Sequence, residues 1–352
     1  MIQRFTFGCP LPTESVVLPV EPAAAAVPYL TAEPDGSWSF SLAEDAVVYG
    51  LGEMPRGINK RGWHYVADNT DESHHGENRL SYYGAHNFLL IDGGAGRSVF
   101  GVFVDFPGKV FYDIGYTRHD RLTFRTEEPD YDLYILTGDS PNAVCTEFRK
   151  LIGHSYIPPK WAFGFAQSRW GYKTAEDVRA IARQYRENEA ASGYDLPGHR
   201  LYAGVRGFYG EQGALPGSGC AECRAEAAGI RLVPIIDAGV RIDPEDPTCT
   251  EGLEKGYFCT KADGTPFVAA VWPGKAYFAD FLRPEVRDWF GHRYKVLTDC
   301  GIEGFWNDMN EPALFYSPER LRAFLDSMAQ LREKDNLEQE EFFAKVVGGA
   351  MG

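Results

Sequence analysis

Between residues 37 and 138 the chain is a series of short apolar runs, rich in β-branched and aromatic residues, that glycine, aspartate and asparagine separate. The clearest runs are Asn87–Ile91, Ser98–Asp105, Lys109–Tyr112 and Tyr131–Leu136. This pattern predicts the short antiparallel strands of an all-β sandwich. The glycine-rich residues 92–96 lie between two runs with no helical pattern after them, so they predict a hairpin and not a phosphate-binding loop.

After Pro158 and Pro159 the pattern changes to alternating buried strands and amphipathic helices. The predicted strands are Trp161–Gln167, Arg231–Ile236 and Gly304–Trp306, and the predicted helices are Ala175–Glu187, capped by Thr174, and Pro284–Thr298. This alternation favours a parallel β/α architecture, with a barrel as the leading interpretation and an open sheet as the alternative. We therefore expect an α+β multidomain protein, with a β-sandwich in residues 1–154 and a barrel domain in residues 155–352.

Composition narrows the choice of partners. The formal net charge is −15 and no lysine- and arginine-rich run is present, so nucleic acid is not an expected partner. The lack of a long apolar run and of a signal-like N-terminus predicts no membrane partner and a cytoplasmic location. The seven scattered cysteines favour reduced thiols, and Cys220 and Cys223 form a lone C-x-x-C that does not predict zinc.

Several short motifs carry a family resemblance. They are Tyr49–Glu53, Asn59–Trp63, Tyr156–Lys160, Ser168–Tyr172, Ile235–Gly239, Val271–Gly274 and, above all, Gly304–Pro312 with the sequence GFWNDMNEP. Together they resemble glycoside hydrolase family 31, with the closest likeness to its bacterial cytoplasmic α-glucosidases. The resemblance covers most of the chain and implies a galactose mutarotase-like sandwich followed by a (β/α)8 TIM-type barrel, here incomplete.

The resemblance makes Asp308 the catalytic nucleophile. A carboxylate in that role attacks the anomeric carbon from the face opposite the leaving group and forms a glycosyl ester that water later hydrolyses. Without the surrounding motif, a strand-end aspartate more often caps a helix or pairs with an arginine. Glu311 and its neighbour Asn310 are expected to support Asp308, because two carboxylates on one turn do not easily straddle a glycosidic bond.

The same resemblance assigns residues that contact the terminal sugar. They are Asp71, Trp170, Asp237, Trp272, Trp306 and Met309. Asp71 and Asp237 are expected to bind sugar hydroxyls, and the three tryptophans to form aromatic walls. The alternatives are a solvated loop charge for Asp71 and a place in the core for Trp170 and Trp306.

The histidines of the loop that holds Asp71 offer a second interpretation. His74 and His75, together with Glu72 and Glu77, are residue types that bind metal. Loop histidines are more often solvated, and retaining glycosidases need no metal. The sequence therefore predicts neither a metal nor a cofactor, and a small oligosaccharide as the binding partner, with homo-oligomerisation left open.

Residues 190–226 depart from the family pattern. Eight glycines lie between residues 193 and 219, a density that is too costly in backbone entropy for a core strand or helix. With free choice among synonymous codons, a one-nucleotide shift re-reads Pro197–Gln212 as LDIDYMQEFEDFTVNK, which holds the missing Asp-x-Asp-Tyr-Met motif of the family. We therefore predict that this segment is out of frame, and the nucleotide sequence tests that prediction.

The barrel part is also short. Residues 155–352 number 198, whereas a complete β/α barrel typically takes about 250 residues. No residue matches the general acid/base of the family, so we expect a truncated and inactive form of a retaining exo-α-glucosidase for short α-linked gluco-oligosaccharides. The alternative is a non-catalytic fragment whose β-sandwich persists as a sugar-binding or structural module.

Overall fold

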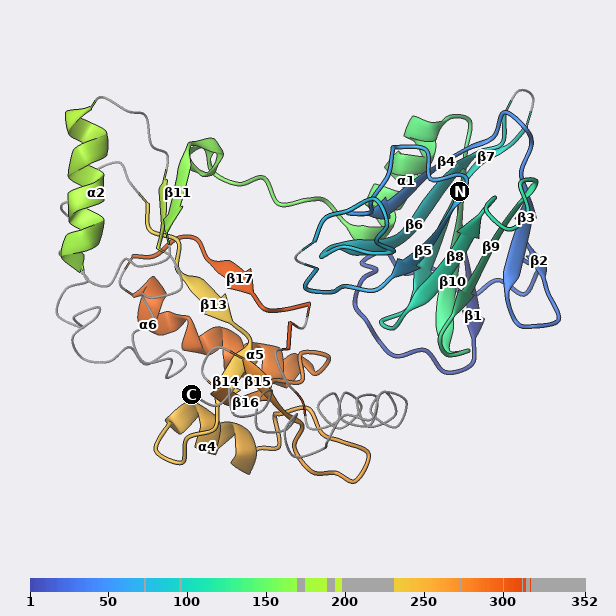
Figure 1. Cartoon of the computed structure of the whole chain (residues 1–352). Coiled ribbons are helices and arrows are strands. Elements are labelled where there is room, and N and C mark those ends of the chain that lie inside the picture. Colours follow the sequence, from blue (N-terminus) through green and yellow to red (C-terminus); the bar gives the residue numbers. More distant parts are fainter. Residues whose placement is uncertain are drawn as a thin grey trace, which may run out of the picture. The chain divides into compact units, whose positions relative to one another are not determined.

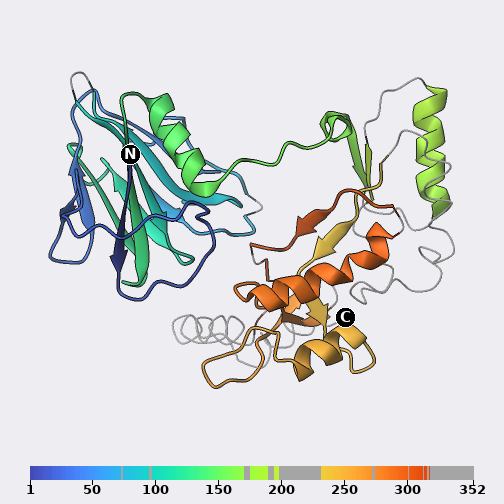
Figure 2. The ribbon, with the colours of Figure 1, turned by 180° about the vertical axis from the view of Figure 1, so that it is seen from behind.

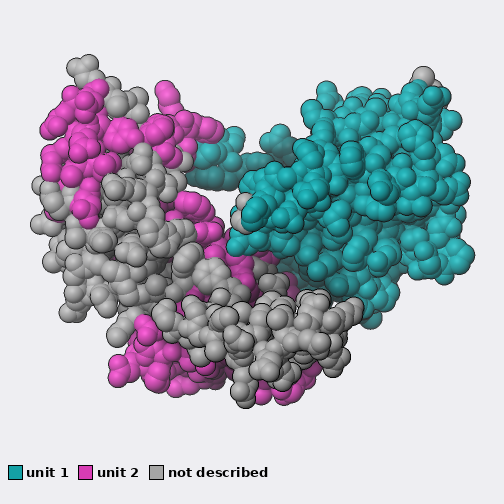
Figure 3. Space-filling view, viewed as in Figure 1, with its two compact units in different colours: residues 1–158 teal, residues 159–352 magenta. Residues whose placement is uncertain are grey.

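The computed structural model describes residues 1–72, 74–94, 97–169, 175–188, 194–197, 231–271, 274–299, 301–311, 313–314 and 317. The chain forms two compact units, residues 1–158 and residues 159–352, which Figure 3 colours separately. Trp170, Trp272 and Thr174 lie outside the described residues, as do Cys220 and Cys223.

The first unit is a sandwich of two antiparallel five-stranded sheets (Figure 1). One sheet has the order β1 (Ile2–Phe7), β10 (Tyr131–Gly138), β7 (Val99–Asp105), β6 (Ala85–Asp92) and β4 (Val47–Gly52). The other has the order β2 (Thr31–Ala32), β3 (Trp38–Ser41), β9 (Arg121–Thr126), β8 (Val110–Ile114) and β5 (Trp63–Ala67). The predicted apolar runs coincide with β6, β7, β8 and β10, and β6 pairs with β7 as the predicted hairpin requires. The predicted sandwich is confirmed.

Helix α1 (Pro141–Ile152) covers the outer face of the first sheet (Figures 1 and 2). Its Val144 and Leu151 are fully buried, in an apolar cluster with Tyr134 and Leu136 of β10. This helix was not predicted from the sequence, although Ser140 and Pro141 carry its start signal: the Ser140 hydroxyl accepts a hydrogen bond from the Ala143 N–H at 3.2 Å. Because α1 covers this sheet, β10 is buried on both faces.

The second unit contains parallel strand pairs and helices of a β/α barrel. Strand β11 (Ala166–Arg169) pairs with β12 (Tyr194–Pro197), and β13 (Ile235–Asp237) pairs with β17 (Trp306–Asp308). Helix α2 (Ala175–Glu187) has the predicted bounds, whereas the predicted helix Pro284–Thr298 is divided at Tyr294 into α5 (Pro284–Arg293) and α6 (Lys295–Thr298).

Two predictions about this unit are wrong. The predicted buried strand Trp161–Gln167 begins as a short 3-10 helix, η1 (Lys160–Phe163), and Phe163 is 73% exposed. Pro159 fixes the backbone before η1, and Gly164 ends it by donating its N–H to the Trp161 carbonyl. The second is the glycine-rich segment 190–226, where the glycine content predicted no core strand: β12 lies in it, before most of its glycines.

An antiparallel sheet and a helix are inserted between β13 and α5. The sheet has the order β14 (Gly239–Arg241), β16 (Gly274–Phe278) and β15 (Val268–Val271), and helix α4 (Pro247–Glu254) lies between β14 and β15 in the chain. Asp246 caps α4, because its Oδ1 accepts a hydrogen bond from the Thr248 N–H at 2.7 Å. The sheet matters for the site because its apolar side chains pack against the residue after Asp308.

Candidate active site

Two aspartates meet at the ends of the parallel strands β13 and β17. Asp237 is the last residue of β13, Asp308 is the last residue of β17, and the two are direct register partners. Neighbouring strands lie about 4.8 Å apart, and aligned residues of a parallel pair point to the same face. The strand pairing therefore brings two carboxylates, distant in sequence, to one point on the C-terminal edge of the sheet, where barrels hold their active sites.

The carboxylate of Asp237 is held in an environment that opposes its charge. Burial, and to a smaller extent the negative charge of Asp308, raise the pKa of Asp237 to about 6. Its Oδ1 is buried and accepts no hydrogen bond from the described residues, and the same is true of Oε2 of Glu311. Buried carboxylate oxygens are ordinarily satisfied, so these two acceptors suit a ligand that brings hydroxyl donors.

The residues around Asp308 fix the end of β17. The Met309 N–H donates to Asp308 Oδ1 at 2.9 Å, and Met309 itself has a φ of 58°, in the left-handed region. The side chains of Trp306 and Asp308 share a face because strand side chains alternate, and Trp306 is 38% exposed. Asn307 points to the opposite face, where its Oδ1 accepts a hydrogen bond from the Tyr294 hydroxyl at 2.8 Å.

A cavity of about 240 Å³ lies on the helix side of these strands. Its lining consists of Ile236, Ala238, Phe281, Phe290, Tyr294, Asn307, Asp308 and Asn310. Tyr294 was not among the residues predicted from the sequence, because its position within a predicted helix gives no local signal of its contact with β17.

Most of the predicted site residues that the structure describes lie together in the second unit. Asp237, Trp306, Asp308 and Met309 come together on β13, β17 and the turn after it, and Asn310 and Glu311 follow in that turn. Asp71 belongs to the first unit, where it is exposed in the loop between β5 and β6.

The histidine-containing loop has contacts of another kind. The carboxylate of Glu72 lies 3.2 Å from Arg79 Nε and 3.8 Å from His74 Nδ1. The ring of His75 packs on that of Tyr82 at 5.0 Å between centroids. No three histidine, cysteine or acidic side chains gather in a metal-binding arrangement within the residues that the structure describes.

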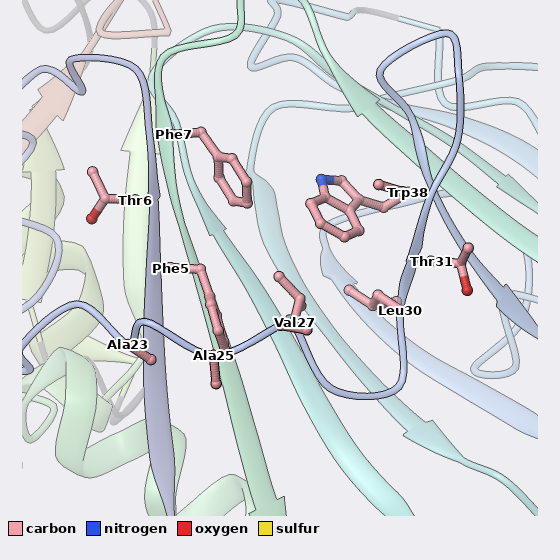
Figure 4. A pocket seen from close by; sticks show the side chains of 11 residues that line it. Phe5, Thr6, Phe7, Ala23, Ala25, Val27, Leu30, Thr31 and Trp38 are labelled. Carbon is pink, nitrogen blue, oxygen red and sulfur yellow. The ribbon is translucent and has the colours of Figure 1, made fainter.

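A second hollow, of about 530 Å³, lies in the sandwich between β1 and the segment around β2 (Figure 4). Its lining is mostly apolar, and the rings of Phe7 and Trp38 meet there at 5.5 Å between centroids. Two polar groups beside it are engaged within the domain: the Trp38 indole N–H donates to the Tyr131 hydroxyl, and the Thr6 hydroxyl donates to Asp132. The hollow therefore offers less to a sugar than the carboxylates of the second unit do.

The fold and the strand-end carboxylates together define a two-unit protein of the β/α-barrel class, with a candidate site at the carboxyl ends of barrel strands. Comparison with known sequences agrees. Residues 155–339 match the domain described as "Glycosyl hydrolases family 31 TIM-barrel domain", and residues 28–113 match the "Glycosyl hydrolase 31 N-terminal galactose mutarotase-like domain". The chain belongs to glycosyl hydrolase family 31, which confirms the resemblance and the predicted fold class.

Named relatives point in the same direction. The chain is 36% identical over 285 residues to Alpha-glucosidase 2 of Bacillus thermoamyloliquefaciens, covering 78% of this chain and 35% of that protein. It is 26% identical over 292 residues to an alpha-glucosidase of Saccharolobus solfataricus, covering 82% and 41%. The chain thus spans about a third to two-fifths of the length of these relatives.

A solved structure supports the fold alone. The family 31 dextranase of Flavobacterium johnsoniae, in complex with glucose, superposes with a TM-score of 0.73 at 23% identity, covering 84% of this chain and 36% of that chain. Within the described residues, every helix is too short or too polar to cross a bilayer.

Proposed function

We propose that this chain carries the nucleophile and the first-sugar site of a retaining, exo-acting α-glucosidase for short α-linked gluco-oligosaccharides. The observation that carries the proposal is the register of β13 and β17, which sets Asp237 directly opposite Asp308 at the carboxyl ends of both strands. The names of two relatives, both α-glucosidases, support the substrate class. An α-xylosidase of Arabidopsis thaliana is also a relative, at 29% identity, so the choice of glucose rests on the WNDMNE motif.

In this proposal Asp308 attacks the anomeric carbon of the terminal glucose. A bond forms between a carboxylate oxygen and C1 while the glycosidic bond breaks, and the leaving oxygen takes a proton from a general acid. Water then opens the ester and restores the α-configuration. Asp237 accepts hydrogen bonds from sugar hydroxyls, and Trp306 packs against the sugar ring from the same face of the sheet.

The test separates the attack by Asp308 from the need for a general acid, because no described residue is assigned to that role. 5-Fluoro-α-D-glucosyl fluoride loses fluoride without protonation and leaves a slowly hydrolysed glucosyl ester on the nucleophile. Peptide mass spectrometry of the treated chain is expected to place the label on Asp308. The Asp308→Asn variant is expected to remain unlabelled, and Asp263→Asn, which changes an exposed aspartate of the same unit, is expected to be labelled normally.

Either of two results contradicts this assignment. The nucleophile is not Asp308 if the label is found on another side chain, or if Asp308→Asn is labelled as fast as the unchanged chain. The substrate class is tested by the corresponding xylosyl reagent, which lacks the hydroxymethyl group. Faster labelling by the xylosyl than by the glucosyl reagent contradicts the glucosidase proposal while leaving the role of Asp308 intact.

The proposal includes a cytoplasmic location. Among the described residues, Cys9, Cys145, Cys249 and Cys259 are all free thiols. Free thiols persist in a reducing compartment, where disulfides are rare. Cell fractionation with an antibody against the chain tests this part of the proposal.

A further inference from the structure

The residues on the two sides of Asp308 are held by different layers of the second unit. Before it, Asn307 accepts a hydrogen bond from the hydroxyl of Tyr294, which lies between α5 and α6. After it, Met309 donates its N–H to Asp308 Oδ1 and inserts its side chain among residues of the antiparallel sheet. The end of β17 is thus restrained from the helix side and from the sheet side.

On the helix side, the restraint is the directional hydrogen bond from the Tyr294 hydroxyl to Asn307 Oδ1. The Tyr294 ring packs edge-on against Phe305 at 4.8 Å between centroids, which fixes where its hydroxyl lies. Burial raises the pKa of Tyr294 to about 12, so the hydroxyl remains a donor at any pH at which the protein is studied. The cavity of about 240 Å³ borders Asn307 and Asp308 on this side. Because side chains do not fill this cavity, packing alone restrains Asn307 only weakly. The hydrogen bond from Tyr294 to Asn307 supplies the missing restraint.

The tether on the sheet side combines an unfavourable backbone with a buried anchor. Residues other than glycine rarely adopt the φ of 58° that Met309 has, and they keep it only where the surroundings enforce it. The Met309 side chain is 7% exposed and belongs to the apolar cluster of Val271, Ala276 and Phe278. This burial holds the turn, and the turn aims the Met309 N–H at Asp308 Oδ1.

Electrostatics explains why the end of β17 needs restraint. Asp237 and Asp308 are register partners, and two carboxylates so close repel each other when both are ionised. A carboxylate at the end of a strand relieves this repulsion by rotating away from its neighbour. A displacement of about 1 Å is enough to remove a nucleophile from its attacking position.

We propose that Tyr294 and Met309 are positioning residues, which hold the Asp308 carboxylate beside Asp237 against their mutual repulsion. The Met309 side chain acts from the buried cluster, so its contribution reaches the sugar through Asp308. This inference rests on the proposed function only in calling Asp308 the nucleophile. The arrangement of the two carboxylates can be measured whether or not the chain is labelled.

The test is a carboxyl ¹³C NMR titration of the aspartates, with the Asp237 signal assigned by its loss in Asp237→Asn. When the Asp308 carboxylate moves away from Asp237, its charge raises the pKa of Asp237 less. We expect Tyr294→Phe and Met309→Gly each to lower the midpoint of Asp237 by about half a pH unit or more. Two matched controls should leave it unchanged: Tyr277→Phe, on β16 of the same unit, and Met309→Leu, which keeps an apolar anchor.

The outcomes are distinct. If both variants remain folded by thermal melting and the Asp237 midpoint does not move, the inference is wrong. If Met309→Gly does not fold, Tyr294→Phe decides alone, because removal of one hydroxyl preserves the ring packing. In the labelling experiment, the maximal rate is expected to fall about tenfold in each variant with little change in reagent affinity. A label on another residue refutes the proposed function, and the NMR titration still decides the positioning.

Discussion

Replacing Asp237 with asparagine should make the second unit more stable at neutral pH and not at acid pH. Asp237 has a buried Oδ1 without a hydrogen bond from the described residues, next to the charge of Asp308. Both features penalise the ionised form of the carboxyl group. Asparagine has nearly the same shape and carries no charge, so the substitution removes that penalty and leaves the packing almost unchanged.

The magnitude follows from the pKa. The carboxyl ionises near 3.8 in the unfolded chain and at about 6 in the folded one, because of burial first and Asp308 second. Between these values the folded state keeps a proton that the unfolded state has lost, so the free energy of unfolding falls as the pH rises. A shift of about 2 pH units corresponds to about 3 kcal/mol, and solvent screening of this partly exposed group reduces the effect to about 1–2 kcal/mol.

The assay is urea unfolding of the unchanged chain and of Asp237→Asn at about pH 4 and about pH 7.5, with the second unit followed separately. The stability gain of the variant should be larger at the higher pH by about 1–2 kcal/mol. Asp263→Asn is the matched control, because Thr265 lowers the pKa of this exposed carboxyl and its pH dependence has the opposite sign. An equal gain at both pH values would refute the reasoning.

Three further predictions concern other parts of the molecule. In Asp308→Asn the NMR midpoint of Asp237 should fall, but not to 3.8, because burial is the larger cause; a fall to 3.8 would contradict this ranking. Gly52→Ala should lower the melting temperature of the first unit, since its φ is 72° and a Cβ would lie 2.5 Å from the Gly84 carbonyl. Gly36→Ala, with a φ of 82° in open space, should cost less. Leu151→Ala should destabilise the first unit by about 2–5 kcal/mol in thermal unfolding, and a loss below about 1 kcal/mol would show that α1 contributes little.

The local pattern of the chain was sufficient for most of the first unit. Strands such as β6 and β7 were predictable because each is a short apolar, β-branched run bounded by turn residues, a signal that lies within the strand itself. Helix α1 was missed although Ser140 and Pro141 are a local start signal and its apolar face packs mainly on β10, the strand directly before it. Strand β12 was excluded on glycine content alone, yet pairing with β11 places Tyr194–Pro197 in a strand. For β12, tertiary pairing outweighed local propensity.

The candidate site, too, combines a feature that the sequence predicts with contacts that only the folded structure shows. The sequence by itself placed Asp308 directly after the predicted strand Gly304–Trp306 and inside a family motif, because motif and apolar run are contiguous there. The structure moves this strand to Trp306–Asp308, so that Asp308 is its last residue. Only the tertiary structure decided that Asp237 is its register partner, that Tyr294 reaches Asn307, and that Met309 is anchored in the antiparallel sheet. These contacts join segments far apart in the chain. Their geometry depends on how whole strands and helices pack, and no local pattern specifies it.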